Sequence, residues 1–454
     1  MFDKIELSNS DNTMVGWVFS RLPENPLKRL HKSETVVRIM NGAFWSVIGT
    51  LSARGLNMVS IIIVARIIGS DSFGKLGIIQ STILLFQSIA LCGLGLAATK
   101  YVSEFRKTDL EKTGRIISFI EKVSVATGGA MALLFFLCSP FIAKNFLAAP
   151  EITGLLQISS SMLFLVTFEG TQNGILAGFE EFRIIANLNF VSGLINIPLL
   201  VFCTWFYGLS GVVLGMLIST LINCLLFFWA SRRRIRLSNI RISRKDSGSE
   251  KKIFWMFCLP SVIGGTVFNL GGWFGNVFLV NSPGGYGEMG FFNAANQWFV
   301  ALLFLPRVLM NVALPIISEQ LGNNEGKKSY KIMTGSIKIY LLFVVPVVFI
   351  LSIASPWIMG LFGNNFKQAW GTLVMTLIAS GIVAVQTPAA QVITASGKMW
   401  KMMVMNCSWA IVFIATSFFL IKWGSLGLAT GRCLAYLFYA GWSFKFAFSI
   451  IRTS

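Results

Sequence analysis

Long apolar segments recur along the whole chain of 454 residues and are separated by short polar turns. Each segment is longer than the roughly 18 apolar residues that mark a membrane-spanning helix. The turns contain Gly, Pro or Asn, which favour chain reversal. The pattern predicts twelve membrane-spanning helices, at 41–67, 73–98, 116–138, 153–178, 184–206, 209–230, 253–281, 290–317, 334–361, 371–396, 401–422 and 425–450.

The second half of the chain repeats short strings of the first half in the same order, 213 to 216 residues later. Phe73-Gly74-Lys75-Leu76-Gly77 returns as Tyr286-Gly287-Glu288-Met289-Gly290, a pattern that would also suit two independent tight loops. Further pairs are Ser46–Gly49 with Ser261–Gly264, Ser103-Glu104 with Ser318-Glu319, Ser139–Ile142 with Ser355–Ile358, and Gly208, Gly211 and Gly215 with Gly424, Gly427 and Gly431. The order and spacing predict two six-helix halves that enter the membrane from the same side, as in transporters that open a central cleft alternately to each side.

These halves define the predicted domains. They are an N-terminal segment 1–40, a six-helix bundle 41–230, a basic linker 231–252 and a second bundle 253–451. With the N-terminus in the cytoplasm, 28 of the 38 basic residues fall in cytoplasmic segments and five in outer ones. The positive-inside rule therefore places both termini in the cytoplasm. The linker carries nine basic residues, which we expect to attract anionic membrane lipids.

Composition supports a membrane protein and excludes some chemistry. Only 13% of the residues are charged, against about 25% in a typical soluble protein. The net charge of +19 follows from the basic loops, so no nucleic-acid partner is expected. All seven cysteines lie in apolar segments and the only histidine is His31. The sequence therefore predicts no metal site and no cofactor.

Several strings resemble a known family. They are Ala65-Arg66-Ile67-Ile68-Gly69, Ser72-Phe73-Gly74, Gly93-Leu94-Gly95 and the run from Gln172 to Arg183. Over about residues 38–450 the chain resembles bacterial polysaccharide transporters, the Wzx-type O-antigen flippases of the multidrug/oligosaccharidyl-lipid/polysaccharide exporter superfamily. Twelve spans resemble these flippases better than the lipid II flippases, which typically have fourteen.

This resemblance implies an all-α, MATE-like fold of two bundles in a V-shaped arrangement. It implies that an undecaprenyl-pyrophosphate-linked oligosaccharide is moved from the cytoplasmic to the periplasmic leaflet of the bacterial inner membrane by alternating access. The cargo would serve O-antigen, lipopolysaccharide or other surface polysaccharide synthesis. A glycan polymerase and a chain-length regulator are further partners that it suggests.

Charged residues deep in the spans are the binding candidates, because a charge at the bilayer centre costs about 2.5–3.5 kcal/mol on insertion scales. Cations would meet a pyrophosphate, and amide side chains would meet sugar hydroxyls. Asn57 lies one turn beyond Arg54, and Asn269 holds the position equivalent to Arg54 in the second half. The cavity candidates are Arg54, Asn57, Asn269, Asn293, Gln297, Arg307 and Arg432. The alternatives are an ion pair or cap for Arg54, a Glu169 partner for Arg307, and headgroup contact for Arg432.

Glu169 is the only acidic residue deep in a span. A carboxyl group in apolar surroundings takes up a proton readily unless it is paired. Glu169 is therefore a candidate for ion coupling, and equally for a silent Arg–Glu pair.

Two other functions compete with the flippase. A multidrug or other small-molecule exporter would favour acidic cavity residues for cationic drugs, whereas cations outnumber acids in these spans. A membrane enzyme would need metal-binding or nucleophilic motifs, and neither a DxD motif nor a membrane-embedded histidine occurs. The sequence therefore predicts a transporter and not an enzyme.

Overall fold

Helices form all of the regular structure in the part of the chain that is described. The computed structural model describes residues 34–240, 259–304 and 326–453, together with positions 306, 317 and 320, and contains no strand within them. The N-terminal helices, here called the N-terminal bundle, are α3 (Glu34–Ala90), α4 (Leu94–Phe105), α5 (Leu110–Asn145), η1 (Pro150–Ile152), α6 (Thr153–Gly178) and α7 (Phe182–Leu237). The C-terminal bundle comprises α9 (Leu259–Val280), α10 (Gly285–Leu302), α12 (Gly326–Ile353), α13 (Ser355–Gly360), η4 (Asn364–Ala369), α14 (Trp370–Ala395), α15 (Met399–Leu420), η5 (Ile421–Trp423) and α16 (Gly424–Thr453).

Helices α3 and α7 each hold two predicted spans that meet at a glycine. Gly69 in α3 has φ 74° and Gly208 in α7 has φ 53°, and both are left-handed values. A side chain with a Cβ resists this backbone region, so glycine allows the sharp turn. A second break, at Cys92 and Gly93 with φ 45° and 65°, divides the predicted second span between α3 and α4.

The described helices account for the predicted number of spans. Among the described residues, seven stretches are long and apolar enough to cross a membrane, and three of them each cover all or most of two predicted spans. These three are Arg54–Ala90, Phe182–Leu237 and Trp400–Arg452. Helices α9 and α10 occupy the positions of the seventh and eighth predicted spans. The prediction of an all-α membrane protein with about twelve spans is confirmed.

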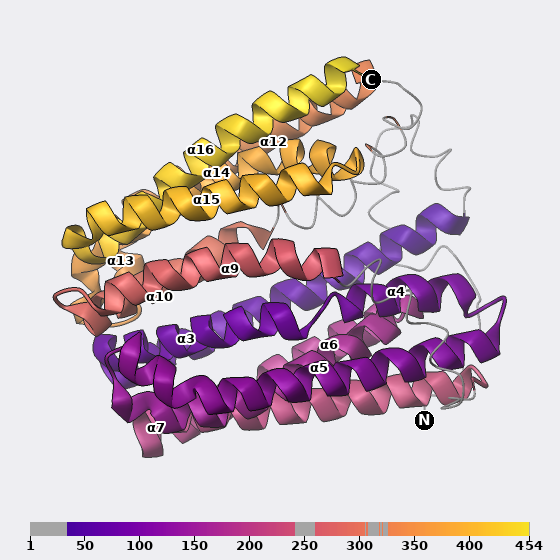
Figure 1. The fold of residues 1–454 in the computed structure, drawn as a ribbon, viewed down its shortest axis with the longest axis horizontal. Coiled ribbons are helices and arrows are strands. Elements are labelled where there is room, and N and C mark those ends of the chain that lie inside the picture. Colours follow the sequence, from indigo (N-terminus) through magenta and orange to yellow (C-terminus); the bar gives the residue numbers. More distant parts are fainter. Residues whose placement is uncertain are drawn as a thin grey trace.

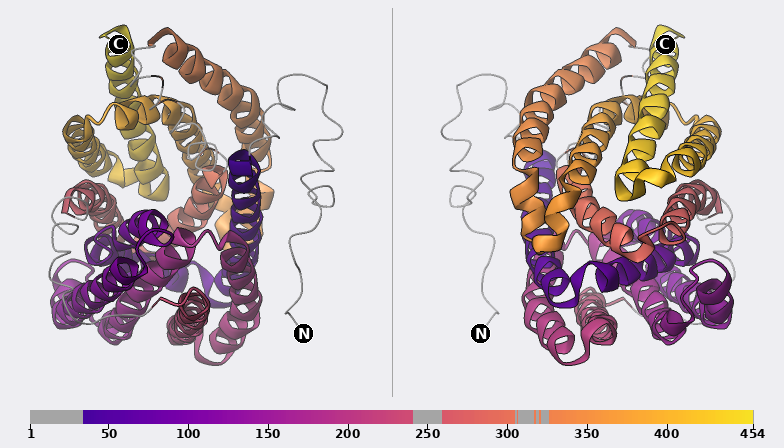
Figure 2. Two further views of the ribbon diagram at one scale, coloured as in Figure 1. Left: turned by 90° about the vertical axis from the view of Figure 1, so that its right-hand side faces the viewer. Right: turned by 90° about the vertical axis from the view of Figure 1, so that its left-hand side faces the viewer.

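The two bundles lie against each other at one end and diverge at the other (Figure 1). They meet near α13 and the turn of α3, and they separate toward the C-terminal end of α16 and the turn between α4 and α5 (Figure 1). Figure 2 shows the C-terminal helices stacked over the N-terminal ones in both end views. Helix α7 continues to Leu237, into the predicted linker 231–252, whose residues from 241 onward lie outside the described ranges, as do residues 1–33 of the predicted N-terminal segment.

The two copies of the repeated string pack against each other where α3 crosses α10. A Cβ on Gly74 would overlap the carbonyl oxygen of Tyr286, and a Cβ on Gly290 would overlap the carbonyl oxygen of Ser70. Small residues at a crossing let two helix backbones approach closely in a membrane protein. The repeat therefore supplies both sides of one contact between the bundles.

Further contacts between the bundles surround this crossing. The indole Nε1 of Trp273 donates to Oγ1 of Thr82 at 3.0 Å, inside an apolar core that includes residues of both bundles. The Nε of Arg66 donates to the carbonyl oxygen of Leu361. Phe73 packs against the ring of Phe366 with the ring centres 6.0 Å apart. This end of the molecule is therefore held closed by buried apolar surface and by hydrogen bonds.

Candidate functional site

Helix α10 lies on the side of the C-terminal bundle that contacts α3, and two of its adjacent faces bear the predicted polar residues. Positions 293, 297 and 300, extended to 304, share one face, and positions 292, 296 and 299 share the next. Residues of the first face contact α3, and residues of the second contact α16. Several of the predicted cavity residues are therefore arranged around this one helix.

Arg54 reaches from α3 to the last turn of α10. Its Nη1 donates to the carbonyl oxygen of Val300 at 3.1 Å, and its guanidinium carbon lies 5.3 Å from the centre of the Phe304 ring. Carbonyl groups in the last turn of a helix lack partners within the helix, and a cation there also meets the negative end of the helix dipole. In this conformation Arg54 thus caps the C-terminal end of α10. A cap was one of the alternatives to cargo binding that the sequence left open for Arg54.

Arg432 is buried between α16 and α10. Its Nη1 donates to Oδ1 of Asn296 at 2.8 Å, and its guanidinium carbon lies 4.3 Å and 4.8 Å from the ring centres of Phe299 and Phe292. Its Nε and Nη2 are buried without a hydrogen-bond partner among the described residues. Only 7% of the residue is exposed, so its guanidinium lies in the protein interior.

Polar side chains of the N-terminal bundle link α3 to α7, where Asn57 is exposed, and α6 to α7, where Glu169 is half-buried. Oδ1 of Asn57 on α3 accepts a hydrogen bond from Nδ2 of Asn196 on α7 at 3.4 Å. Oε1 of Glu169 on α6 accepts one from Nδ2 of Asn223 at 2.7 Å, and Oδ1 of Asn223 accepts another from Ser192. The partner of Glu169 among the described residues is thus an amide that links it to both arms of α7.

The other predicted cavity residues fall in different places. Asn293 is buried at the crossing of the bundles, where its Nδ2 lies 3.4 Å from the carbonyl oxygen of Phe73 and its side chain packs on Gly77. Gln297 is half-buried one turn further along α10, and Asn269 is half-buried on α9. Arg307, and with it the predicted pair with Glu169, lies outside the described residues.

Sequence reasoning missed the polar residues of α7. Ser192 lies three residues after Asn189, and Asn196 lies four residues after Ser192, so the three side chains share one helix face. That spacing was the available signal, although hydroxyl and amide side chains in an apolar span attract less attention than charges. Asn223 lies in the second arm of α7 and follows Ser219 and Thr220 at spacings of four and three, so the same signal was present there.

The contacting end of the molecule carries a second polar cluster, around Glu151 in the turn that precedes the predicted span 153–178. Nζ of Lys75 lies 3.0 Å from Oε1 of Glu151 and 5.5 Å from the centre of the Tyr286 ring. The hydroxyl of Tyr286 donates to the carbonyl oxygen of Leu147 at 2.7 Å. Hydrogen bonds from the backbone at Glu151 and from Lys75 hold the pKa of the Glu151 carboxyl below its ordinary value. The cluster ties α10 to the turn between α5 and α6.

The arrangement suits the binding of an anion that also carries hydroxyl groups. Arginines supply charge-assisted hydrogen bonds, and the asparagines and glutamine supply neutral ones. No group of three or more His, Cys, Asp or Glu side chains that could hold a metal ion occurs among the described residues. The chemistry of the site is thus that of recognition through cations, amides and aromatic rings.

The sequence of the chain is similar to a known protein family and to polysaccharide export proteins. The sequence model of the family described as polysaccharide biosynthesis protein matches residues 39–321. The EPS I polysaccharide export inner membrane protein EpsE of Ralstonia solanacearum is 22% identical over 393 residues, which are 84% of this chain and 87% of that protein.

Two solved transporter structures share this architecture. A multidrug resistance MATE family transporter of the MOP superfamily, in its inward-facing conformation, aligns with a TM-score of 0.76 and 16% identity over 89% of this chain and 96% of its own. The lipid II flippase MurJ, in an inward closed conformation, aligns with a TM-score of 0.69 and 16% identity over 88% of this chain and 87% of its own. The predicted MATE-like fold is confirmed.

Proposed function

Because the chain belongs to the polysaccharide biosynthesis protein family, we propose that it carries a lipid-linked oligosaccharide across the bacterial inner membrane. The proposed cargo is an undecaprenyl-pyrophosphate-linked unit of O-antigen or of another surface polysaccharide, moved from the cytoplasmic to the periplasmic leaflet. The relative EpsE is named as a polysaccharide export inner membrane protein, and one structural neighbour is named as a lipid II flippase. These names support a polyprenyl-linked saccharide as the class of cargo.

The observation that carries the proposal is the pair of arginines around α10. Arg54 and Arg432 lie in membrane-spanning helices, where cations are costly and mark binding sites for anions. Arg432 retains two buried nitrogens without partners among the described residues. A buried donor without a partner costs about 1–3 kcal/mol, and a phosphate oxygen would recover that energy.

The contact of Arg54 suits exchange with such a cargo. A neutral main-chain carbonyl of α10 accepts the hydrogen bond from its Nη1 at 3.1 Å. The donor is already a cation, and an anionic phosphate adds the attraction of opposite charges and can accept from two N–H groups of the guanidinium at once. A pyrophosphate would therefore displace the Val300 carbonyl, and this exchange would release one contact between the bundles.

The arrangement of the bundles fits entry from the cytoplasm. They diverge at the end that bears the turn between α4 and α5, and the basic residues predict that this end is cytoplasmic (Figure 1). Passage to the other side then requires the crossing of α3 and α10 to part. The repeated string supplies both surfaces of that crossing, as an alternating-access mechanism with two similar bundles requires.

Deletion of the gene in its native host tests the proposal. We expect surface glycan to be lost and lipid-linked single units to accumulate in the inner leaflet, because later steps of assembly take place outside the cytoplasm. Complementation with the intact gene is the control. A deletion strain that keeps its glycan but becomes sensitive to cationic drugs would instead support an exporter of small molecules.

A further inference from the structure

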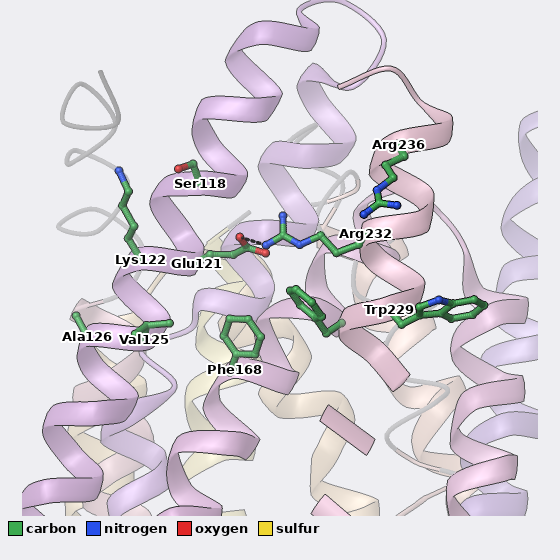
Figure 3. A pocket seen from close by; sticks show the side chains of 10 residues that line it. Ser118, Glu121, Lys122, Val125, Ala126, Phe168, Trp229, Arg232 and Arg236 are labelled. Atoms are coloured by element: carbon green, nitrogen blue, oxygen red, sulfur yellow. Dashed lines mark hydrogen bonds and ion pairs between the residues drawn. The ribbon is translucent and has the colours of Figure 1, made fainter. Parts of the chain in front are cut away.

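A pocket on the flank of the N-terminal bundle combines positive charge with aromatic surface. It has a volume of about 880 Å³ and lies between α5, α6 and the second arm of α7. Figure 3 shows Arg232 directed at Glu121, with Lys122 on one side and Arg236 above. Residues that line it include Ser118, Glu121, Lys122, Trp229, Arg232 and Arg236.

The charge of this pocket is positive because its lining holds three cations and one carboxylate, and that carboxylate is paired with only one of them. Oε2 of Glu121 accepts a hydrogen bond from Nη2 of Arg232 at 2.7 Å, and its Oε1 accepts one from Nε2 of Gln172 at 2.9 Å. The pair is partly buried, with side-chain exposures of 26% for Arg232 and 12% for Glu121. The lining thus holds three cations and one carboxylate whose two oxygens both accept hydrogen bonds, and Glu121 fixes the position of Arg232.

An apolar groove continues from the pocket along α5 and α6. It has a volume of about 460 Å³ and is lined by Gly129, Ala132, Leu133, Phe136, Phe164 and Leu165, together with two serines of α6. On α5, positions 122, 125, 129, 132 and 136 recur every three or four residues, so they share one face. From Lys122 to Phe136 this face extends over about 21 Å, at a rise of about 1.5 Å per residue.

We propose that this pocket and groove bind one anionic phospholipid of the surrounding bilayer. The phosphodiester lies among Lys122, Arg232 and Arg236, and one acyl chain lies along the groove between α5 and α6. The anionic headgroup complements the excess of cations. The pocket and groove together extend over about 21 Å along α5, which exceeds the depth of one leaflet, about half of a 30 Å hydrocarbon core.

The position of the pocket favours a bilayer lipid over the proposed cargo. Contact between the bundles is made mainly by α3 with α9 and α10, whereas the pocket is built from α5, α6 and α7. It also lies at the predicted cytoplasmic headgroup level, where anionic lipids gather and where lysine, arginine and tryptophan side chains are favoured. The proposal is independent of which substrate the protein transports.

Thermal unfolding of the purified full-length protein in a non-ionic detergent tests this site. A lipid that binds only the folded state raises the midpoint of unfolding, and the increase grows with the logarithm of the lipid concentration divided by its dissociation constant. We expect phosphatidylglycerol to raise the midpoint more than phosphatidylethanolamine does, because only the former carries a net negative charge. Equal effects of the two lipids on the wild-type protein would overturn the proposal.

Two variants address the two parts of the site. Arg236→Gln removes an exposed cation without breaking the pair of Arg232 with Glu121, and we expect it to weaken phosphatidylglycerol binding about fivefold. Gly129→Leu fills the groove, and a Cβ at Gly129 meets no atom within 4 Å, so the fold tolerates it. Matched controls are Lys107→Gln, at an exposed position outside the pocket, and Gly154→Leu, at another open glycine.

The responses of these variants locate the bound lipid on the protein surface. We expect both controls to keep the wild-type response to phosphatidylglycerol while Arg236→Gln and Gly129→Leu lose much of it. A full response in both site variants would place lipid binding elsewhere and refute the proposal. Displacement of phosphatidylglycerol by lower concentrations of undecaprenyl phosphate would identify the occupant as the glycan carrier, which would overturn the choice of a bilayer lipid.

Discussion

The guanidinium groups of the two arginines around α10 have different hydrogen-bond partners. Arg54 donates to a helix carbonyl that another acceptor can replace, whereas Arg432 makes one hydrogen bond to Asn296 and keeps two buried nitrogens without described partners. Sequence reasoning found both residues because a cation within an apolar span is conspicuous. It did not find their partners, because Val300 and Asn296 face them only through the rotation of α10, which tertiary packing sets.

Replacement of Arg432 by an apolar residue separates binding from stability. Arg432→Met removes a buried cation, and replacing buried charges by apolar groups of similar size is often neutral or stabilising by about 1–4 kcal/mol. We expect the midpoint of unfolding to be unchanged or raised while export of surface glycan is lost. If Arg432 were only structural, the variant would be destabilised and any folded fraction would still export glycan.

The role of Glu169 is tested by a change that preserves its hydrogen bond. In the wild type, Nδ2 of Asn223 donates to Oε1 of Glu169 at 2.7 Å. In Glu169→Gln the amide oxygen can still accept this hydrogen bond, but the side chain cannot take up or release a proton. We propose that Glu169 couples transport to a proton gradient, so we expect at least tenfold slower export at wild-type expression, about 1.4 kcal/mol in the rate. Asn223→Ala, which removes the partner and keeps the carboxyl, is the matched variant. Wild-type export by Glu169→Gln would exclude the coupling role.

At the scale of helices, the length of the apolar segments sufficed to locate them. Helices α6 and α14 cover 153–178 and 370–395, against predictions of 153–178 and 371–396. The sequence did not predict which helix faces contact each other. A span that is apolar on all sides has no periodic pattern of polar residues to mark its buried face. The crossing of Gly74 with Tyr286 and the bond between Asn57 and Asn196 were therefore not predictable from one sequence.

The glycine crossing can be tested with a control built into the repeat. Gly74→Ala places a Cβ against the Tyr286 carbonyl, whereas a Cβ at Gly287, the repeat equivalent of Gly74, meets no atom within 4 Å. We expect Gly74→Ala to lower the free energy of unfolding by about 1–3 kcal/mol, and Gly287→Ala to leave it unchanged or raise it slightly. Thermal unfolding in detergent measures both variants. Equal values for the pair would show that the close approach does not hold the bundles together.

At the scale of the whole molecule, the described conformation is closed at one end. The crossing of α3 and α10, the bond of Trp273 to Thr82 and the cluster around Lys75 all lie in the contact between the bundles or beside it. We propose that this end faces the periplasm and that these contacts break together when the cargo leaves. Such a change is a rigid rotation of one bundle against the other, because each bundle keeps its own helix packing.

The ion pair of Lys75 with Glu151 gives the closed end a dependence on pH. The pKa of Glu151 is lowered from its ordinary value of 4.5. The stabilisation is therefore complete above that value and is lost as the pH falls through the lower folded value. We expect the free energy of unfolding of the wild type to fall toward that of Glu151→Gln in this acidic range, by less than about 1 kcal/mol because Glu151 is exposed. Glu104→Gln, at an exposed position of α4, is the control, and an unchanging difference between wild type and Glu151→Gln would contradict the assignment.

The central claim is that the protein carries a lipid-linked oligosaccharide across the bilayer through the region around α10. The most direct measurement uses proteoliposomes that contain the purified protein and lipid-linked oligosaccharide extracted from a strain that lacks the gene. A membrane-impermeant glycosidase then reports how fast internal cargo reaches the outer leaflet. We predict a rate well above that of protein-free vesicles, reduced at least tenfold by Arg54→Ala and Arg432→Met. A rate equal to that of protein-free vesicles, with correctly folded protein and an imposed proton gradient, would contradict the claim.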